Sequence, residues 1–263
     1  MPKEDRITTI VGNWKMHKTI VEARAYVAGL SLVAYSDFLK VGVAVPFTMI
    51  AVAAEAARGS SILIGAQNVS QHSIGAYTGE ISPSMVKDAG ASFCIIGHSE
   101  RRRLFHETNE IVNIKTKLAL ESGLKALVCV GETLEQRQGN TTKEILKDQI
   151  LLSLKGLTAQ QLKNLILAYE PIWAIGTNPA SAEQAQEAHH LCREVISKEW
   201  GNETAEALII QYGGSVRIEN AAELLKQPDI DGLLVGGASL ELDTFSQIIH
   251  FQNQNYSNIV SQH

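Results

Sequence analysis

Residues 165–196 read LILAYEPIWAIGTNPASAEQAQEAHHLCREVI and contain one complete strand-and-helix unit. The apolar run at 165–167 is continuous rather than alternating, which predicts a strand buried on both faces, as in a parallel sheet. Ser181 with Gln184 three residues later matches a capping box at the start of a helix. The helix itself is indicated by apolar residues at i, i+3, i+4, i+7 and i+8, namely Ala188, Leu191, Cys192, Val195 and Ile196.

The same unit recurs along the chain. Apolar runs followed by turn residues and a helical pattern occur at 7–11, 43–45, 62–64, 94–96, 127–130, 165–167, 208–210 and 233–235. Eight such units in about 250 residues predict a (β/α)8 barrel. An open, doubly wound parallel sheet is the alternative, although it usually has fewer strands. Because no linker-like or low-complexity segment divides the chain, we expect a single domain over residues 1–263.

Composition narrows the class of protein. Charged residues make up 19% and hydrophobic residues 45%, which is typical of a globular chain and too apolar for a disordered one. The formal net charge of −5 argues against a nucleic-acid-binding or membrane-surface protein, because both need a basic face. Three widely spaced cysteines predict free thiols in a reducing compartment. With no signal-peptide pattern and no membrane-length apolar segment, we expect a cytoplasmic protein.

Polar residues gather where the predicted strands end. They follow six of the eight runs: Asn13 and Lys15, Gln67 and Asn68, His98 and Glu100, Glu132, Glu170, and Ser215. The glycines Gly236 and Gly237 follow a seventh. A closed barrel brings all carboxyl ends of its strands to one mouth, which is where barrel enzymes have their active sites. This placement favours the barrel over the open sheet more strongly than the periodicity does.

Two glycine-rich turns follow the seventh and eighth runs, at 213–215 and 236–239. Glycine allows backbone N–H groups to approach a phosphate, and barrels often bind phosphate with the loops after strands 7 and 8. Either turn alone is better explained as a tight strand-to-helix connection. The pair at these two positions predicts a phosphate site.

Three side chains are candidates for chemistry. Glu170, next to Pro171 at a strand end, fits a general base and fits equally a structural carboxylate paired with an arginine. His98 precedes a predicted helix, whose positive end disfavours an imidazolium and leaves a neutral donor. Lys15 follows the first strand beside Asn13.

The remaining charged groups receive structural interpretations. The other seven histidines fit core or surface positions. The arginine run at 101–103 is expected to form salt bridges with carboxylates such as Glu100 and Glu107. No group of His, Cys and carboxylate residues has metal-ligand spacing, so we expect no metal site.

Taken together, the motifs resemble those of the triosephosphate isomerase family, and the similarity extends over nearly the whole chain. The matching segments are GNWKMH at 12–17, GAQNV at 65–69, GAYTGEIS at 75–82, IIGHSERR at 95–102, CVGET at 129–133, AYEPIWAIGT at 168–177, YGGSV at 212–216 and LVGGASL at 234–240.

The resemblance implies a TIM barrel, a homodimer, and the interconversion of dihydroxyacetone phosphate and D-glyceraldehyde 3-phosphate, a step of glycolysis and gluconeogenesis, with no cofactor or metal. It implies that Glu170 moves the carbon-bound proton, that neutral His98 polarises the carbonyl, and that Lys15 stabilises the enediolate. This enzyme is itself a reference case for such pKa tuning, and these roles are the family's. The resemblance also implies that Asn13 orients the substrate and that Glu100 supports the site. It further implies that the phosphate is held by Gly176, Ser215, Gly236 and Gly237.

Two segments carry further expectations from the resemblance. Residues 171–177 form a lid that excludes water, and residues 75–79 form a loop that reaches a second subunit. The family usually continues from Gly-Thr into Gly-Lys, whereas Thr177 here precedes Asn178 and Pro179. Proline restricts its own φ and the residue before it, so we expect altered lid motion with unaltered chemistry.

Two rival functions remain at this point. Another phosphate-binding barrel enzyme, such as an aldolase, would share the turns after strands 7 and 8. A non-catalytic binding protein on the same barrel would be favoured by loss of Lys15, His98 or Glu170, and all three are present.

Overall fold

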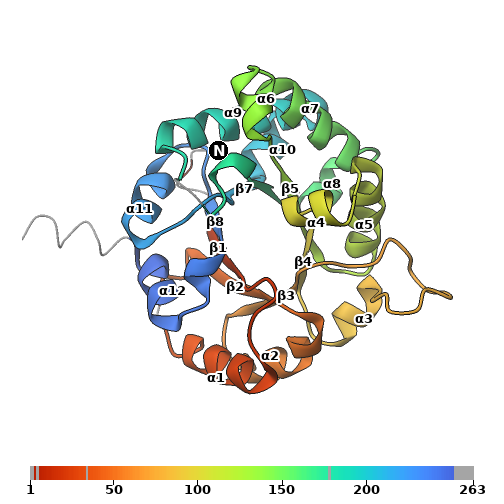
Figure 1. The fold of residues 1–263 in the computed structure, drawn as a ribbon, viewed down its shortest axis with the longest axis vertical. Helices are drawn as coiled ribbons and strands as arrows, with labels where there is room; N and C mark the ends of the chain where they lie inside the picture. The colour runs from red at the N-terminus through yellow and green to blue at the C-terminus, as the bar shows by residue number, and fades with distance from the viewer. Residues whose placement is uncertain (1–2, 4–5, 34, 177–178, 252–263) are drawn as a thin grey trace, which may run out of the picture.

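Eight parallel strands close into a barrel in the order β1-β2-β3-β4-β5-β6-β7-β8 (Figure 1). The computed structural model describes the chain except residues 1–2, 4–5, 34, 177–178 and 252–263. The strands are β1 (Thr8–Asn13), β2 (Leu39–Val45), β3 (Leu63–Ala66), β4 (Phe93–Ile96), β5 (Lys125–Val130), β6 (Leu165–Tyr169), β7 (Ile209–Tyr212) and β8 (Gly232–Val235). The predicted (β/α)8 barrel is confirmed, and the open sheet is excluded because β1 pairs with β8.

Helices surround the barrel as an outer ring (Figure 1). They are α1 (Ile20–Leu30), α2 (Ile50–Ala56), α3 (Pro83–Asp88), α4 (Ser99–Leu104), α5 (Asn109–Glu121), α6 (Leu134–Gln138), α7 (Thr142–Ser153), α8 (Ala159–Leu162), α9 (Ala182–Trp200), α10 (Asn202–Ala207), α11 (Ile218–Lys226) and α12 (Leu242–Ile249). Short 3₁₀ turns occur at η2 (Phe47–Met49), η3 (Ile172–Ala174) and η4 (Gly237–Ser239). No helix in the described part of the chain is both long and apolar enough to span a membrane.

Helix α9 shows how local sequence sets these elements. Ser181 accepts a hydrogen bond from the Gln184 N–H, and the Gln184 side chain returns one to the Ser181 N–H, so the predicted capping box is present. Ala188, Cys192 and Ile196 are buried as predicted, but Leu191 and Val195 are only partly buried. Their place in the buried stripe is taken by the polar residues His189 and Arg193. The hydrophobic pattern did not predict that His189 and Arg193 are buried, because both are polar and are buried only with hydrogen-bond partners in the interior.

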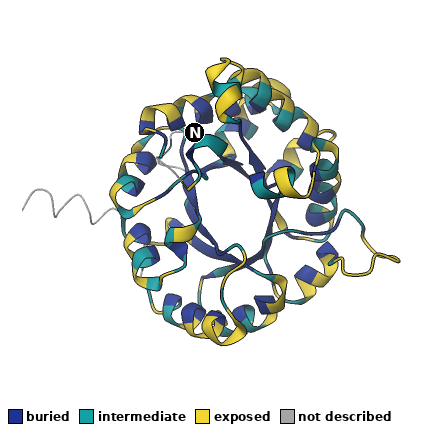
Figure 2. Ribbon diagram, in the orientation of Figure 1, coloured by how far each residue is buried: buried dark blue, intermediate teal, exposed yellow. Residues whose placement is uncertain are grey.

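Two cores stabilise the barrel. The larger lies between strands and helices, and the smaller fills the barrel itself with Val11, Ala44, Phe93, Ile95, Leu127, Cys129, Ala168 and Leu234. The strands are accordingly buried on both faces (Figure 2). The Phe93 ring occupies space left by two glycines: a Cβ on Gly65 would lie 2.3 Å from the Phe93 Cζ, and one on Gly42 would lie 3.2 Å from its Cε1.

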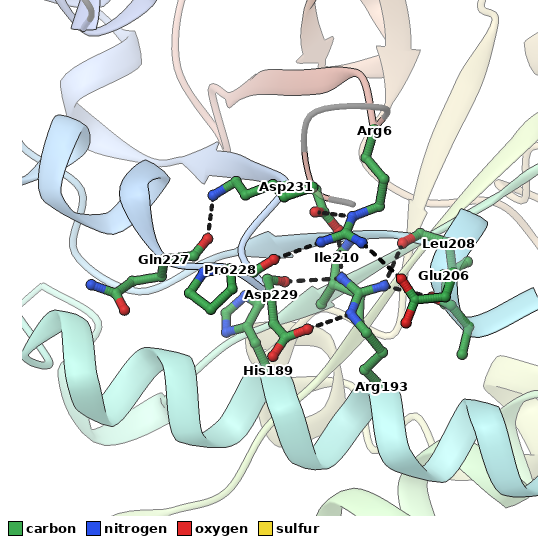
Figure 3. Close-up of polar contacts among 12 residues, drawn as sticks. Arg6, His189, Arg193, Glu206, Leu208, Ile210, Gln227, Pro228, Asp229 and Asp231 are labelled. Atoms are coloured by element: carbon green, nitrogen blue, oxygen red, sulfur yellow. Dashed lines mark hydrogen bonds and ion pairs between the residues drawn. The ribbon is translucent and has the colours of Figure 1, made fainter. Parts of the chain in front are cut away.

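A buried ion network joins the last two strands to α9 at the amino-terminal end of the barrel (Figure 3). Arg193 donates from Nη2 to Asp231 Oδ2 at 2.7 Å and from Nε to Asp229 Oδ1 at 2.7 Å. Arg6 donates to the other oxygen of Asp231 at 2.6 Å. Asp231 also accepts from the Ile210 N–H at 2.9 Å, so each charge in this dry site is paired.

Candidate active site

A cavity of about 310 Å³ lies at the carboxyl ends of the strands. Its lining is Asn13, Lys15, His98, Glu170, Ile175, Gly176, Gly213, Gly214, Ser215, Val216, Arg217, Leu234, Gly236, Gly237 and Ala238. Every residue predicted for catalysis or phosphate binding is among them. Glu100, predicted as a supporting residue, does not line the cavity but contacts two residues that do.

Glu170 lies immediately after β6 and is 1% exposed. Its Oε2 accepts a hydrogen bond from the Ser99 N–H, the first residue of α4, at 2.9 Å. Its Oε1 is 3.1 Å from His98 Nε2. That short separation lacks hydrogen-bond geometry, and Oε1 accepts no hydrogen bond from any described residue. One carboxylate oxygen is therefore anchored, and the other is left available next to an imidazole.

His98 is the N-cap residue of α4, where the predicted helix does begin. The Glu100 N–H donates to His98 Nδ1 at 3.2 Å. An Nδ1 that accepts a hydrogen bond carries no proton, so the neutral ring carries its hydrogen on Nε2. The helix end therefore selects the tautomer of this imidazole.

Lys15 adopts a left-handed backbone with φ of 52°, which is costly for a side chain with a Cβ. Its N–H donates to Asn13 Oδ1 at 3.1 Å, and its carbonyl accepts from Gln67 Nε2 at 2.8 Å. Its ammonium is 2.5 Å from Glu100 Oε1. Partial burial opposes ionisation of Glu100, but the Lys15 hydrogen bond and the nearby charges outweigh it and hold the pKa of Glu100 below its usual range.

The opposite wall of the cavity is mostly backbone. The Gly176 N–H donates to Ser215 Oγ at 3.0 Å, and the Ser215 N–H donates to the Ala174 carbonyl at 2.9 Å. These bonds fasten residues 174–176 to the turn after β7. A Cβ on Gly236 would lie 3.7 Å from Lys15 Cε, so the turn after β8 passes close to the ammonium. The wall is glycine-rich backbone beside a cation, which suits an anion once the Gly176 and Ser215 N–H groups exchange their present acceptors for it.

The sequence matches the triosephosphate isomerase family model over residues 8–252. It is 51% identical to the triosephosphate isomerase of Protochlamydia amoebophila over 251 residues, 95% of each chain. It is 49% identical to that of Carboxydothermus hydrogenoformans and 50% identical to that of Acetivibrio thermocellus, covering 91% of this chain and 96% of the relative in both cases.

The chain belongs to the triosephosphate isomerase family.

The resemblance drawn from the motifs is thereby confirmed. Some contacts that shape the site in this family member escaped the sequence. The Ser99 N–H is a backbone group, so its residue type gave no signal. Gln67 was noted as a polar residue after β3, but only the fold shows that its amide also bridges to the Ala44 carbonyl, at 3.0 Å. It thereby ties the strained Lys15 turn to β2.

Glu132 was also noted without a role, and it is fully buried after β5. Its Oε1 accepts from the Trp173 Nε1–H at 2.9 Å and from the Tyr169 hydroxyl at 3.0 Å. Arg137 stacks over the Trp173 ring, its guanidinium carbon 4.9 Å from the centroid. Trp173 of the predicted lid is therefore held at both its N–H and its ring face. The predicted hinge residue Asn178 lies outside the described residues.

The arginine run is structural in part as predicted. Arg101 Nε is 2.5 Å from Glu107 Oε1, so that pair is present. The expected pairing of the run with Glu100 is wrong, because Glu100 pairs with Lys15 across the site. Arg102 instead donates to the carbonyls of Gly97 and Cys129, at 2.8 and 3.1 Å, and ties α4 to the ends of β4 and β5.

The residues that the structure describes contain no group of three or more His, Cys, Asp or Glu side chains arranged to hold a metal ion.

Proposed function

We propose that the protein interconverts dihydroxyacetone phosphate and D-glyceraldehyde 3-phosphate. The observation that carries the proposal is the pair formed by Glu170 Oε1 and His98 Nε2, 3.1 Å apart in one cavity with Lys15. Removing a proton next to a carbonyl needs a base on carbon and a donor on oxygen at the same moment.

In this proposal Glu170 is the base. Its Oε1 removes a proton from the carbon next to the carbonyl, and the C–H electron pair forms the double bond of an enediolate. The hydroxyl hydrogen of the substrate moves from one oxygen to the other through His98. The same carboxyl group then returns the carbon-bound proton to the neighbouring carbon, which yields the isomeric sugar. The anchor from Ser99 leaves Oε1 as the oxygen that acts.

His98 and Lys15 stabilise the negative oxygen. The neutral imidazole donates its Nε2–H to the substrate oxygens, a role that the Glu100 N–H bond on Nδ1 supports. The Lys15 ammonium adds positive charge where negative charge develops, and Asn13 positions the Lys15 backbone.

The phosphate would lie against the turns after β7 and β8, held by backbone N–H groups of Gly176, Ser215, Gly236 and Gly237. Those of Gly176 and Ser215 would exchange their present acceptors, Ser215 Oγ and the Ala174 carbonyl, for phosphate oxygens. Residues 171–177 would act as a lid, because an enediolate phosphate loses its phosphate in water. The mechanism uses no metal and no cofactor.

The test is a coupled assay of glyceraldehyde 3-phosphate isomerisation with the purified chain. Turnover in the usual enzymatic range, about 1–10³ s⁻¹ or above, supports the proposal. No turnover with either triose phosphate, together with activity on another phosphorylated sugar, would favour the rival barrel enzyme. Tight binding without turnover of any substrate would favour the binding protein.

We also infer a homodimer. The loop between β3 and α3 projects from the barrel rim (Figure 1). It exposes Ile74 (88%) and Tyr77 (45%), and Met16 beside the Lys15 turn is 94% exposed. Apolar side chains in such positions are typical of surfaces that bind another chain. Sedimentation should give twice the 28.6 kDa of one chain; an active monomer would contradict the inference.

A cytoplasmic location is the third part of the proposal. All three cysteines are free thiols and buried, as expected in a reducing compartment. Cell fractionation with an antibody to the protein tests it, and recovery in a membrane or secreted fraction would contradict it.

A further inference from the structure

A second cavity opens at the other end of the barrel and has no part in the proposed reaction. It has a volume of about 360 Å³ and lies at the amino ends of the strands. Val11 and Phe93 of the inner core line it, together with the partly buried Leu63, Ile166 and Ile209. Its size is at the lower end of small-molecule sites, and its lining is mostly apolar, as such sites are.

Three lysines, Lys40, Lys125 and Lys163, also line this cavity, and we call them the lysine rim. Strand register places two of them on the inner face. Lys125 shares its face of β5 with Leu127 and Cys129, which fill the barrel, because side chains alternate along a strand. Lys40 shares its face of β2 with Ala44 in the same way.

The lysine rim has no internal counter-charge. Among the described residues, no acidic residue lines the cavity. The ammonium groups of Lys40, Lys125 and Lys163 form no ion pair or hydrogen bond with any described residue. The fourth cation at this mouth, Arg6, differs, because its guanidinium is paired with Asp231 (Figure 3). Three unpaired like charges around an apolar opening, in a chain of net charge −5, form a local site for an anion.

We propose that this mouth binds a free medium-chain fatty carboxylate, with the alkyl chain in the apolar cavity and the carboxylate on the lysine rim. The two halves of the site match the two halves of that ligand. An inorganic anion would leave the apolar lining unused, and a neutral hydrocarbon would leave the lysines unpaired. The inference is independent of the isomerase activity, which takes place at the opposite mouth.

Solvated lysines whose stems merely cover an apolar opening are the alternative explanation. The two explanations differ in what happens when a matched ligand is offered. Decanoate is the probe, titrated calorimetrically below its micelle concentration and in phosphate buffer, so that phosphate competes at the other mouth. One saturable site per chain is expected. Hexanoate should bind about fourfold more weakly for each methylene removed, and decyltrimethylammonium should not bind.

Variants locate the site. The triple variant Lys40→Gln, Lys125→Gln and Lys163→Gln should weaken decanoate binding about tenfold. Lys147→Gln, which removes one exposed positive charge on α7, should leave it unaltered. Ala207→Trp keeps the rim charges but places a ring on an exposed residue that lines the opening, and should block binding. Isomerase turnover should be unchanged in all three variants.

Isoleucine methyl NMR separates this mouth from the rest of the surface. Decanoate should shift the signals of Ile7, Ile166 and Ile209. Absence of saturable binding, equal affinity of the triple variant and wild type, or shifts confined to other isoleucines would each overturn the proposal.

Discussion

The buried ionic groups at the two mouths of the barrel differ in how far their hydrogen bonding is satisfied. At the amino end, the buried Arg193 directs donors to Asp229, to Asp231 and to the carbonyls of Ala205 and Leu208. At the carboxyl end, the equally buried Glu170 leaves one oxygen without a hydrogen bond among the described residues.

The backbone at the carboxyl mouth is also strained, which fits a role of this mouth in catalysis. Lys15 at the carboxyl mouth has a strained left-handed backbone, held by Asn13 and Gln67. Unsatisfied groups and strain cost stability but are available to a substrate. The satisfied groups of the Arg193 network stabilise the fold and have no free donor or acceptor for a ligand; the exposed lysine rim at the same mouth is separate from this network. Changes at the carboxyl mouth should therefore affect rate, and changes in the amino-end network should affect stability.

The largest effect is expected from Glu170→Gln. The amide keeps the size of the side chain but cannot accept the carbon-bound proton, so kcat should fall about 10²–10⁴-fold. Steady-state kinetics in the coupled assay measures this. The free energy of unfolding should change little, and Glu121→Gln on the exposed end of α5 should alter neither quantity. Near-normal turnover in folded Glu170→Gln protein would contradict the assignment of Glu170 as the base.

Arg193→Met should have the opposite signature. It leaves Asp231 and Asp229 buried with fewer partners, which should lower the free energy of unfolding by about 3–5 kcal/mol, measured by urea denaturation. Turnover per folded chain should stay within about twofold, since the site is distant. Arg58→Met, at an exposed residue after α2, is the control. If kcat falls with stability unchanged, the two mouths are not independent.

The third prediction concerns the acid sensitivity that the buried His189 of α9 gives to the fold. It is fully buried, and burial lowers its pKa to about 4, against an ordinary value of 6.5. Between these values the unfolded chain binds a proton that the folded chain does not. Stability is therefore complete above pH 6.5 and falls toward pH 4, by about 3 kcal/mol for this group.

Urea denaturation at pH 7, 5.5 and 4 measures that loss. His189→Gln removes the titrating group and should flatten this part of the pH dependence, while His190→Gln, exposed on the same helix, should not. Equal pH profiles for both variants would assign the acid sensitivity to other residues.

The smallest effect is expected at the lid. Ser215→Ala removes the acceptor of the Gly176 N–H. This bond competes with the phosphate for the Gly176 N–H, and a neutral hydrogen bond contributes about 1 kcal/mol, so KM for the triose phosphate should fall by up to about fivefold with kcat changed less. Trp173 fluorescence on ligand binding follows the lid, with Trp173→Phe as the control for Trp14 and Trp200. A loss of kcat as large as that of Glu170→Gln would give Ser215 a direct part in the chemistry.

The sequence by itself determined the barrel and the membership of the carboxyl mouth. Continuous apolar runs fix strands buried on two faces, and polar residues directly after them must meet once the strands close. The sequence alone therefore assigns Asn13, Lys15, His98 and Glu170 to one site.

Only the tertiary structure decided which groups touch. The pairing of Glu100 with Lys15 instead of an arginine joins residues 85 positions apart, and no local pattern specifies such a contact. The Ser99 N–H and the buried Arg193 were missed because backbone donors carry no residue signature and because a charge is buried only where distant partners compensate it. The unpaired lysine rim follows from the same cause: strand closure, not composition, gathers three cations around one apolar opening.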